Sequence, residues 1–314
     1  MLAIVAPGQG SQTPGFLTPW IEHFAQFGPQ IPAMVEHWSE ICGVDLNRLG
    51  TTADADEIRD TANAQPLLLL GALTGAGGLF AGNDEAISVV AGHSVGEIAA
   101  ALFAKILSAD DAFKLVSTRG REMAKAASVS ATGMSAVLGG DRDTVVNHLI
   151  SLGLTPANEN GAGQIVAAGS LTALAALSEN PPEGARVRPL QVAGAFHTST
   201  MAPAVETLAA LATTTQALDP AIRIISNKDG AEITSGREFL DRIVGQIAGP
   251  VRWDLCMDTF AEMGVTGVIE MPPAGTLVGL IKRAHPEIET FALKTPEDLD
   301  AAREFVAKHG RVNS

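Results

Sequence analysis

The stretch from Ala86 to Leu107, AISVVAGHSVGEIAAALFAKIL, decides the fold because it joins a strand to a helix through one tight turn. Residues 86–91 form a short apolar run typical of a buried strand, and residues 97–107 have the length and apolar content of a helix. The turn between them, GHSVG at Gly92–Gly96, is the only Gly-x-Ser-x-Gly in the sequence. This order predicts a nucleophile elbow, and the alternative is a glycine-rich turn that holds an inert serine.

Ser94 stands at the centre of this turn. The flanking glycines avoid the clashes that a Cβ would create in a strained backbone. The helix that follows directs free N–H groups and a positive dipole toward the serine. Ser94 is therefore the candidate nucleophile.

Outward from this turn, short apolar runs alternate with longer amphipathic runs. The further strands predicted from this pattern cover residues 2–6, 222–226, 265–270 and 288–293. The predicted helices cover residues 237–247 and 276–284, and a last helix begins at Pro296. Strands separated by helices predict a parallel sheet that is covered on both faces.

The segment from residue 134 to residue 192 breaks this alternation. Its predicted order is strand, helix, strand, strand, helix, strand, over residues 134–138, 144–151, 154–158, 164–168, 171–178 and 187–192. This is the split-βαβ, ferredoxin-like order. We therefore predict an α/β protein in which a small ferredoxin-like (βαββαβ) subdomain is inserted into a larger domain built on a parallel sheet.

The composition of the 314 residues limits the classes of partner. Hydrophobic residues make up 46% and charged residues 18%, which predicts a folded protein with a sizeable core. A net charge of −14 argues against nucleic acid and anionic membranes as main partners, because both select clustered Lys and Arg. The two cysteines, Cys42 and Cys256, provide no disulfide framework.

Two apolar stretches could be mistaken for a targeting signal or a membrane span, and neither has the pattern of one. Residues 1–6 lead directly into Pro7-Gly8, without the basic and then apolar profile of a signal peptide. The uncharged stretch 61–83 has five glycines from Gly71 to Gly82, whereas a membrane span needs about 20 mostly apolar residues. We expect a buried helix and a loop there, no membrane partner, and a cytoplasmic protein.

A serine nucleophile needs a base, and His197 is the best placed of the seven histidines. It follows Phe196 where the predicted small subdomain ends, and a junction between domains is a common place for a cleft. His93 is adjacent to Ser94, but neighbouring side chains at a strand end diverge, so its ring is not expected to reach the serine. The other five histidines lie on polar helical runs or near helix ends.

A Ser-His-Asp hydrolase also needs an acid to orient the histidine, and in α/β-hydrolases it lies between Ser and His in the chain. The acidic residues from Asp110 to Glu183 look like helix caps or solvated loop residues. The sequence therefore favours a Ser-His pair without a carboxylate, which leaves a serine esterase or thioesterase as the weaker alternative. No cluster has metal-ligand spacing, and Thr13 stands where a dinucleotide fingerprint needs its third glycine, so no metal or bound cofactor is expected.

Three motifs together resemble the malonyl-CoA:acyl carrier protein transacylases of bacterial type II fatty acid synthesis, which are related to polyketide synthase acyltransferase domains. They are Pro7-Gly8-Gln9-Gly10-Ser11-Gln12, Gly92-His93-Ser94-Val95-Gly96-Glu97 and Phe196-His197. The similarity continues through Gln65-Pro66, Arg119-Gly120-x-x-Met123, Asn158-x-Asn160-x-x-Gly163-Gln164 and Gln246-x-x-x-Pro250-Val251-x-Trp253. It covers essentially the whole chain and implies an α/β-hydrolase-like core, residues 1–127 and 198–314, with the ferredoxin-like subdomain at residues 128–197.

The resemblance implies catalytic roles for five residues. Ser94 would take the malonyl group as an ester, and His197 would act as its base and then as the acid for the departing thiolate. The main-chain carbonyl of Gln246, rather than a carboxylate, would hold the His197 ring. The N–H groups of Gln9 and Val95 would form the oxyanion hole.

The resemblance also implies the substrate contacts. Arg119 would bind the free carboxylate of the malonyl group, with Gln65 nearby, because a guanidinium can make two parallel hydrogen bonds to a carboxylate. Asn158 and Asn160 would line the channel for the phosphopantetheine arm. The ring of Phe196 would fill the space that an α-methyl group needs, which predicts a preference for malonyl-CoA over methylmalonyl-CoA.

The implied reaction is a ping-pong transfer from malonyl-CoA to acyl carrier protein, with CoA thioester as substrate and phosphopantetheine on the carrier. Carrier proteins are acidic, so docking would depend on local cations, for which the candidates are Arg186, Arg188, Lys282 and Arg283. Scattered solubilising charge is the alternative explanation of these four. A non-catalytic docking subunit with the same fold is a further alternative, and the sequence leaves the oligomeric state open, with a monomer as the simplest case.

Overall fold

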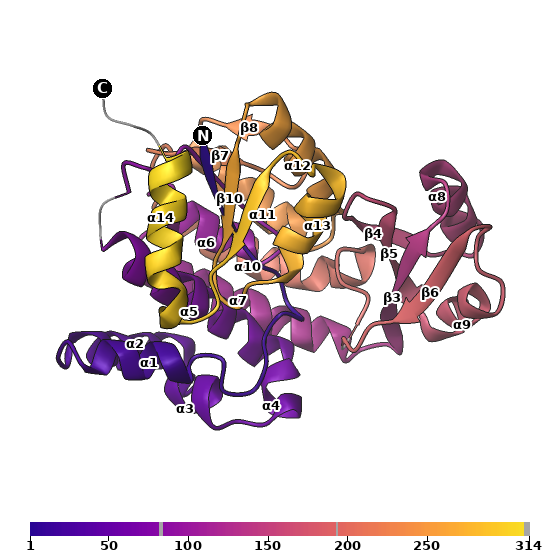
Figure 1. Cartoon of the computed structure of the whole chain (residues 1–314). Coiled ribbons are helices and arrows are strands. Elements are labelled where there is room, and N and C mark those ends of the chain that lie inside the picture. Colours follow the sequence, from indigo (N-terminus) through magenta and orange to yellow (C-terminus); the bar gives the residue numbers. More distant parts are fainter. Residues whose placement is uncertain (82–83, 193, 311–314) are drawn as a thin grey trace.

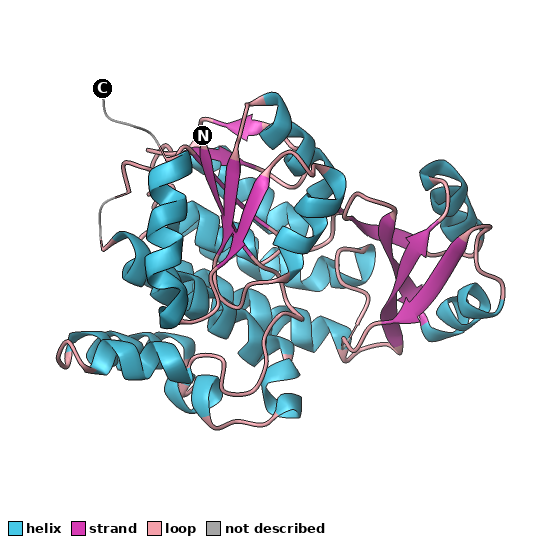
Figure 2. Cartoon of the chain, viewed as in Figure 1, coloured by secondary structure: helices cyan, strands magenta, loops and turns pink. Residues whose placement is uncertain are grey.

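The computed structural model of the chain describes residues 1–81, 84–192 and 194–310. The chain forms a six-stranded and a five-stranded β-sheet, with helices packed around both (Figures 1 and 2). The larger sheet and most of the helices make up one part of the molecule, and the smaller sheet with two helices projects from it at the right of Figure 2. The predicted α/β class is confirmed.

The six-stranded sheet has the order β11-β10-β1-β2-β7-β8. Its strands are β1 (Leu2–Ala6), β2 (Val89–Gly92), β7 (Arg223–Ile225), β8 (Glu232–Ile233), β10 (Gly267–Glu270) and β11 (Glu289–Ala292). All neighbouring pairs are parallel except β7 and β8, which form an antiparallel hairpin. The carboxyl ends of β1 and β2 therefore lie side by side, and the turns that follow them meet at one edge of the sheet.

Twelve α-helices among the described residues accompany this sheet. They are α1 (Thr18–Ala25), α2 (Gln30–Cys42), α3 (Leu46–Thr51), α4 (Ala55–Arg59), α5 (Thr61–Phe80), α6 (Gly96–Phe103), α7 (Ala109–Ala127), α10 (Ala202–Thr214), α11 (Gly236–Gln246), α12 (Trp253–Glu262), α13 (Thr276–Ala284) and α14 (Leu299–His309). Two short 3₁₀ helices, Ser199–Met201 and Pro296–Asp298, lead into α10 and α14. Across the described part of the chain, no helix combines the length and the apolar character that a membrane crossing requires.

Both faces of the sheet are buried, as β1 shows residue by residue. Leu2, Ile4 and Ala6 belong to one hydrophobic cluster, and Ala3 and Val5 belong to another. Successive side chains of a strand point to opposite faces, so the two clusters are the cores on the two sides of the sheet. The predicted parallel sheet with two covered faces is confirmed.

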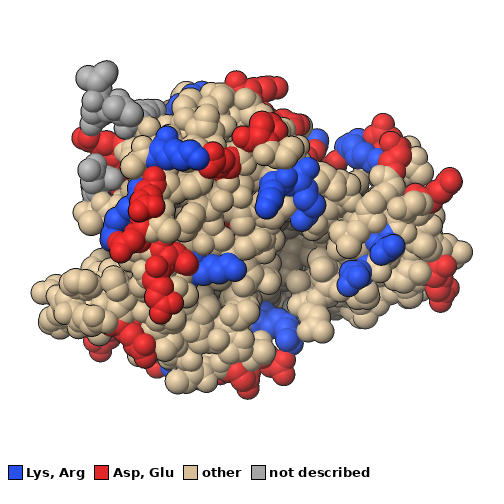
Figure 3. All heavy atoms as spheres, viewed as in Figure 1, with Lys and Arg blue, Asp and Glu red and all other residues tan. Residues whose placement is uncertain are grey.

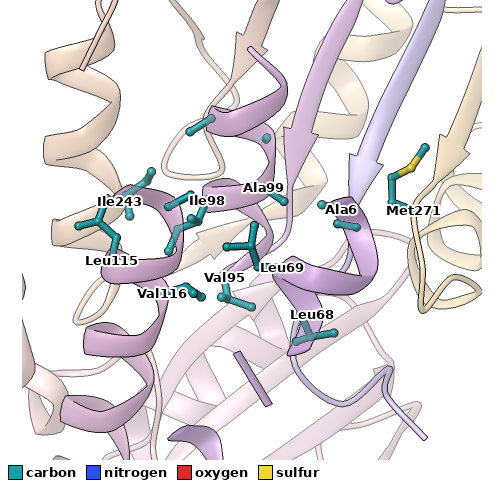
Figure 4. Close-up of a cluster of buried hydrophobic side chains, with 14 of the residues drawn as sticks. Ala6, Leu68, Leu69, Val95, Ile98, Ala99, Leu115, Val116, Ile243 and Met271 are labelled. Carbon is teal, nitrogen blue, oxygen red and sulfur yellow. The ribbon is translucent and has the colours of Figure 1, made fainter. Parts of the chain in front are cut away.

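The larger cluster packs α5, α6, α7 and α11 against one face of the sheet. Figure 4 shows part of it, in which Val95 and Ile98 lie near Val116 of α7 and Ile243 of α11. This packing fixes α6 behind β2, and with it the turn that carries Ser94.

The five-stranded sheet has the order β6-β3-β5-β4-β9. Its strands are β3 (Thr132–Gly139), β4 (Thr155–Glu159), β5 (Gln164–Ser170), β6 (Ala185–Pro189) and β9 (Val251–Arg252), and its helices are α8 (Arg142–Ser151) and α9 (Leu171–Glu179). The predicted order strand, helix, strand, strand, helix, strand is confirmed. The fifth strand, β9, comes from far along the chain and pairs in parallel with Asn158 and Glu159 of β4.

Several predicted boundaries differ from the structure. The strand predicted at 86–91 begins at Val89, because residues 84–87 form a turn. The helix predicted at 97–107 ends at Phe103, and the chain then turns through Lys105, whose φ is +64°. The strand predicted at 187–192 ends at Pro189, because a turn from Leu190 to Val192 follows. Residues 82, 83 and 193, which fall in or beside predicted segments, lie outside the described residues.

Candidate active site

The turn between β2 and α6 has the geometry that the sequence predicts. Ser94 has a φ of +53°, a conformation in which residues other than glycine are uncommon. A Cβ on Gly92 would lie 2.0 Å from the carbonyl carbon of Gly96, and a Cβ on Gly96 would lie 2.2 Å from the carbonyl oxygen of Ala6. Only glycine fits at these two positions, so the strained turn and its half-buried serine are fixed by the close approach of β1, β2 and α6.

His197 lies beside Ser94, with its Nε2 2.8 Å from the serine Oγ. The other ring nitrogen, Nδ1, lies 2.8 Å from the main-chain oxygen of Gln246. A carbonyl oxygen only accepts, so Nδ1 carries the proton and Nε2 presents its lone pair to the serine hydroxyl. Burial, and next the positive charge of Arg119, lower the pKa of His197 to about 3, so the ring is neutral and ready to accept a proton.

His93 has a different hydrogen-bond partner from His197. Its Nε2 lies 2.9 Å from the side-chain oxygen of Asn160. Burial lowers the pKa of His93, which favours the neutral ring, and the bonded Nε2 then donates to the amide oxygen. As expected from the sequence, the histidine next to the nucleophile is not its partner.

Arg119 projects from α7 and is almost completely buried. One terminal nitrogen lies 3.2 Å from Ser94 Oγ and 2.8 Å from Gln246 Oε1, and the other lies 2.9 Å from Gln65 Oε1. Its Nε has no partner among the described protein atoms. Burial lowers the pKa of Arg119 to about 10, so the guanidinium is still charged near neutral pH. A buried cation that contacts only uncharged oxygens is a strong site for an anion.

The predicted site residues share one cavity of about 250 Å³ between the two sheets, where Figure 3 shows a hollow in the surface. Its lining includes Gln9, Gln65, Ser94, Val95, Arg119, Asn158, Asn160, Phe196 and His197. Gln246 lies behind this lining and reaches it through its bonds to His197 and Arg119. The structure therefore brings together every residue that the sequence selected for the site.

Sequence reasoning misses other residues at the site. The cavity is also lined by apolar side chains from β3, β5 and α13, among them Met134, Val166 and Leu280. Glu97 and Asn227, both buried, bond to Gln246 just behind the cavity. Asn227 directly follows the predicted strand at 222–226, and a polar residue at the carboxyl end of a parallel strand is a signal for such a position.

The arrangement suits acyl transfer. It combines a nucleophilic hydroxyl, a neutral histidine at hydrogen-bond distance, and a fixed cation 3.2 Å from the same hydroxyl. Across residues 1–81, 84–192 and 194–310, no three His, Cys, Asp or Glu side chains come together as a metal site. The cation next to the nucleophile favours an acyl group that itself carries a negative charge.

Comparisons with known proteins agree with this chemistry. Residues 4–302 match the family model described as acyl transferase domain. The malonyl CoA-acyl carrier protein transacylase of Mycobacterium tuberculosis is 51% identical over 305 residues, which cover 96% of this chain and 98% of that protein.

Solved structures give the same result. A crystal structure of MCAT from Mycobacterium tuberculosis superposes with a TM-score of 0.90 at 50% identity, over 96% of this chain and 99% of that one. A malonyl-transacylase solved in complex with its type II PKS acyl-carrier protein superposes with a TM-score of 0.88 at 28% identity, over 96% of this chain and 99% of that one. The chain therefore belongs to the acyl transferase family and, within it, to the malonyl CoA-acyl carrier protein transacylases.

Proposed function

We propose that the chain moves the malonyl group from malonyl-CoA to the phosphopantetheine thiol of an acyl carrier protein. One observation carries this proposal: Ser94 Oγ lies within hydrogen-bond distance of both His197 Nε2 and the Arg119 guanidinium. A serine and histidine alone would serve any acyl group. The buried cation beside them selects an acyl group that ends in a carboxylate.

Acylation begins when malonyl-CoA places its carboxylate on Arg119 and its thioester carbonyl next to Ser94. His197 Nε2 takes the hydroxyl proton as the serine oxygen attacks the carbonyl carbon. The carbon–sulfur bond then breaks, and the same proton passes from His197 to the CoA thiolate. The products are CoA and a malonyl ester on Ser94.

The attack places a negative charge on the former carbonyl oxygen. The N–H groups of Val95, at the start of α6, and of Gln9, in the turn after β1, are the proposed donors to this oxygen. Both residues line the cavity, and the two turns meet because β1 and β2 are neighbours in the sheet. Each such donor typically contributes about 3–4 kcal/mol to catalysis.

Transfer to the carrier repeats these steps in reverse order. The pantetheine arm enters along Asn158 and Asn160, His197 takes the proton of its thiol, and the sulfur attacks the ester carbon. The carbon–oxygen bond breaks, and His197 returns the proton to Ser94. The main-chain carbonyl of Gln246 holds the imidazole throughout, in the place where a hydrolase has a carboxylate.

We further propose that the larger part of the chain, residues 1–127 and 198–314, is an α/β-hydrolase-like core, and that residues 128–197 form the ferredoxin-like subdomain. The serine turn after a central parallel strand supports the first assignment. The antiparallel order β6-β3-β5-β4, with both helices connecting its strands, supports the second. The cytoplasmic location expected from the sequence belongs to the same proposal.

Mass spectrometry of the protein mixed with malonyl-CoA tests the proposed function. We expect Ser94 to gain one malonyl group that is stable until carrier protein is added, and Ser94→Ala to gain none. Rapid release of free malonate without a carrier would instead indicate a serine esterase or thioesterase. The absence of any adduct on the unaltered protein would indicate a docking subunit without catalytic activity.

A further inference from the structure

Glu97 is a buried carboxylate that the proposed mechanism does not use. It lies in the first turn of α6, three residues after Ser94, and is only 1% exposed. Its Oε1 accepts from the main-chain N–H of Asn227 at 2.7 Å, and its Oε2 accepts from the side-chain amide nitrogen of Gln246 at 2.5 Å. Its two oxygens therefore meet two different donors. Burying a charged group is costly, so this carboxylate calls for a functional explanation.

The side chain of Gln246 connects Glu97 to Arg119. Its amide nitrogen faces acceptors only, namely Glu97 Oε2, the side-chain oxygen of Asn227 at 2.8 Å and the main-chain oxygen of Ser94 at 3.3 Å. Its amide oxygen accepts from Arg119 at 2.8 Å. Burial raises the pKa of Glu97 to about 7, and in its ionised form the carboxylate only accepts, whereas the Arg119 guanidinium only donates. These two neighbours therefore favour the same orientation of the Gln246 amide as the oxygens of Ser94 and Asn227 do.

We propose that Glu97 is a positioning residue: through the side-chain amide of Gln246, it holds the Arg119 guanidinium in the orientation that receives the carboxylate of the acyl group. This inference rests on the proposed function, because it assigns Arg119 to the substrate carboxylate. The Glu97 side chain acts through Gln246 and Asn227, and only its main-chain N–H bonds to Ser94, at the main-chain oxygen.

The change Glu97→Gln preserves the size of the side chain and exposes its proposed role. The main-chain N–H of Asn227 cannot turn, so the new amide oxygen goes to it, and the new NH₂ group faces the NH₂ of Gln246. Turning the Gln246 amide over does not relieve this contact, because its oxygen would then face the main-chain oxygen of Ser94 and the side-chain oxygen of Asn227. The Gln246 side chain is therefore pushed aside, and Arg119, which donates to its amide oxygen, is displaced from its place beside Ser94.

The test compares malonyl transfer with acetyl transfer, because an acetyl group has no carboxylate for Arg119 to bind. We expect Glu97→Gln to lower kcat/KM for malonyl-CoA about tenfold or more, and to lower kcat/KM for acetyl-CoA far less. The measured quantity is the ratio of the two constants, so a general loss of folded protein cancels. The matched control is Glu238→Gln, which removes an exposed carboxylate from α11 and should leave the ratio unchanged.

Two further variants keep the inference open to refutation if Glu97→Gln folds poorly. Gln246→Met removes the amide but keeps the main-chain carbonyl that accepts from His197, and it should lower the malonyl-to-acetyl ratio in the same direction. In an Arg119→Ala background, Glu97→Gln should change the ratio no further, since its effect passes through Arg119.

The outcomes separate this inference from the proposed function. An unaltered protein that transfers no malonyl group to a carrier would overturn the function. The unaltered protein could transfer malonyl groups while Glu97→Gln and Gln246→Met have the same malonyl-to-acetyl ratio of kcat/KM as the unaltered protein. The proposed function would then stand, and the role of Glu97 would be refuted. An equal loss of malonyl and acetyl transfer would likewise refute it, because that result indicates only structural damage.

Discussion

At the scale of single residues, His197 is kept neutral by its surroundings. Its ring is buried next to the positive charge of Arg119, and its pKa is lowered to about 3. We expect the ¹⁵N shifts of its ring to remain those of a neutral imidazole, protonated on Nδ1, between about pH 5 and 8. Titration of this ring near the ordinary histidine pKa would contradict the burial argument.

The lowered pKa of His197 also makes the free energy of unfolding depend on pH. In the unfolded chain His197 takes up a proton below about pH 6.5, whereas in the folded chain it does so only near pH 3. Between these values unfolding binds a proton, so this residue makes the fold less stable as the pH falls below about 6.5.

Arg119 is the proposed binding residue for the carboxylate of the malonyl group. One terminal nitrogen bonds to Gln65 and the other to Gln246 and Ser94, and the single nitrogen of a lysine cannot occupy both positions. We expect Arg119→Lys to lower kcat/KM for malonyl-CoA at least about tenfold, chiefly through KM. Steady-state kinetics check this, and full activity of the variant would show that a point charge is sufficient.

Phe196 is the proposed determinant of selectivity at the α-carbon of the acyl group. Its buried side chain lines the cavity next to His197. Excluding one methyl group is worth about 1–3 kcal/mol, so we expect malonyl-CoA to be preferred over methylmalonyl-CoA by roughly 10- to 200-fold. Phe196→Ala should narrow this preference in competition assays, and equal rates for the two substrates in the unaltered protein would remove Phe196 from this role.

At the scale of secondary-structure elements, the serine turn depends on how closely β1 approaches α6. The Cβ of Gly96→Ala would lie 2.2 Å from the Ala6 carbonyl oxygen, and the atoms nearest to it all belong to the backbone rather than to a flexible side chain. We expect this variant to lose about 3 kcal/mol or more of unfolding free energy, measured by denaturant titration.

Gly245 on α11 provides the matched control. A Cβ there would meet no atom within 4 Å, so Gly245→Ala should be neutral or should stabilise the protein by up to about 1 kcal/mol. Equal losses in the two variants would show that helical glycines in general, rather than this close approach, explain the effect.

How well the elements were predicted depends on the length of their sequence signal. β1 and α13 were predicted with the boundaries that the structure has, since each has a clear apolar pattern. β8 and β9 were missed because a strand of two residues has no period to detect.

The starts of the short helices α3 and α4 and of α5 were not predicted, although the sequence marks each of them with a capping residue. Asp45, Asp54 and Asp60 each cap one of these helices with the side chain, and the spacing of these three residues marks the three starts. At the site, motifs located the polar residues, while Met134 and Val166 were indistinguishable from core residues in the sequence. Glu97 lay within a recognised motif, but its role depends on Gln246, which is far away along the chain and adjacent only in the fold.

At the scale of the whole molecule, four exposed cations flank the cavity. Arg186 and Arg188 lie on β6 and pair with Leu138 and Ala136 of β3. Paired residues point to the same face, so both arginines share the face of Met134, which lines the cavity. Lys282 and Arg283 lie in the last turn of α13, whose earlier residues line the opposite wall.

These four cations are the proposed docking surface for the carrier protein. In the described part of the chain none of them forms an ion pair within 4.0 Å, and Figure 3 shows basic side chains on both sides of the hollow. Since the net charge is −14, attraction of an acidic partner has to come from such local cations. We expect neutralising all four with glutamine to raise KM for the carrier several-fold, most strongly at low salt, with kcat unchanged.

A comparison of two double variants separates the effect of where the cations lie from the effect of the net charge, because each variant removes two positive charges. Lys282→Gln with Arg283→Gln removes two charges beside the cavity, whereas Arg303→Gln with Lys308→Gln removes two from α14, which lies away from it (Figure 1). Only the first pair should change KM for the carrier. An unchanged KM for the carrier after neutralising all four cations would show that they do not dock the carrier and only make the surface more soluble.

The pairing of β9 with β4 has a consequence for protein engineering. Residues 251–252 complete the smaller sheet at Asn158 and Glu159, and they follow Gln246 by only a few residues. A chimera that exchanges only residues 128–197 with a relative would join a foreign β4 to the host's β9 and would disturb the neighbouring carbonyl on which His197 depends. Recombination intended to transplant acyl preference therefore needs a second crossover region around residues 246–253, so that both partners of this pairing come from one parent.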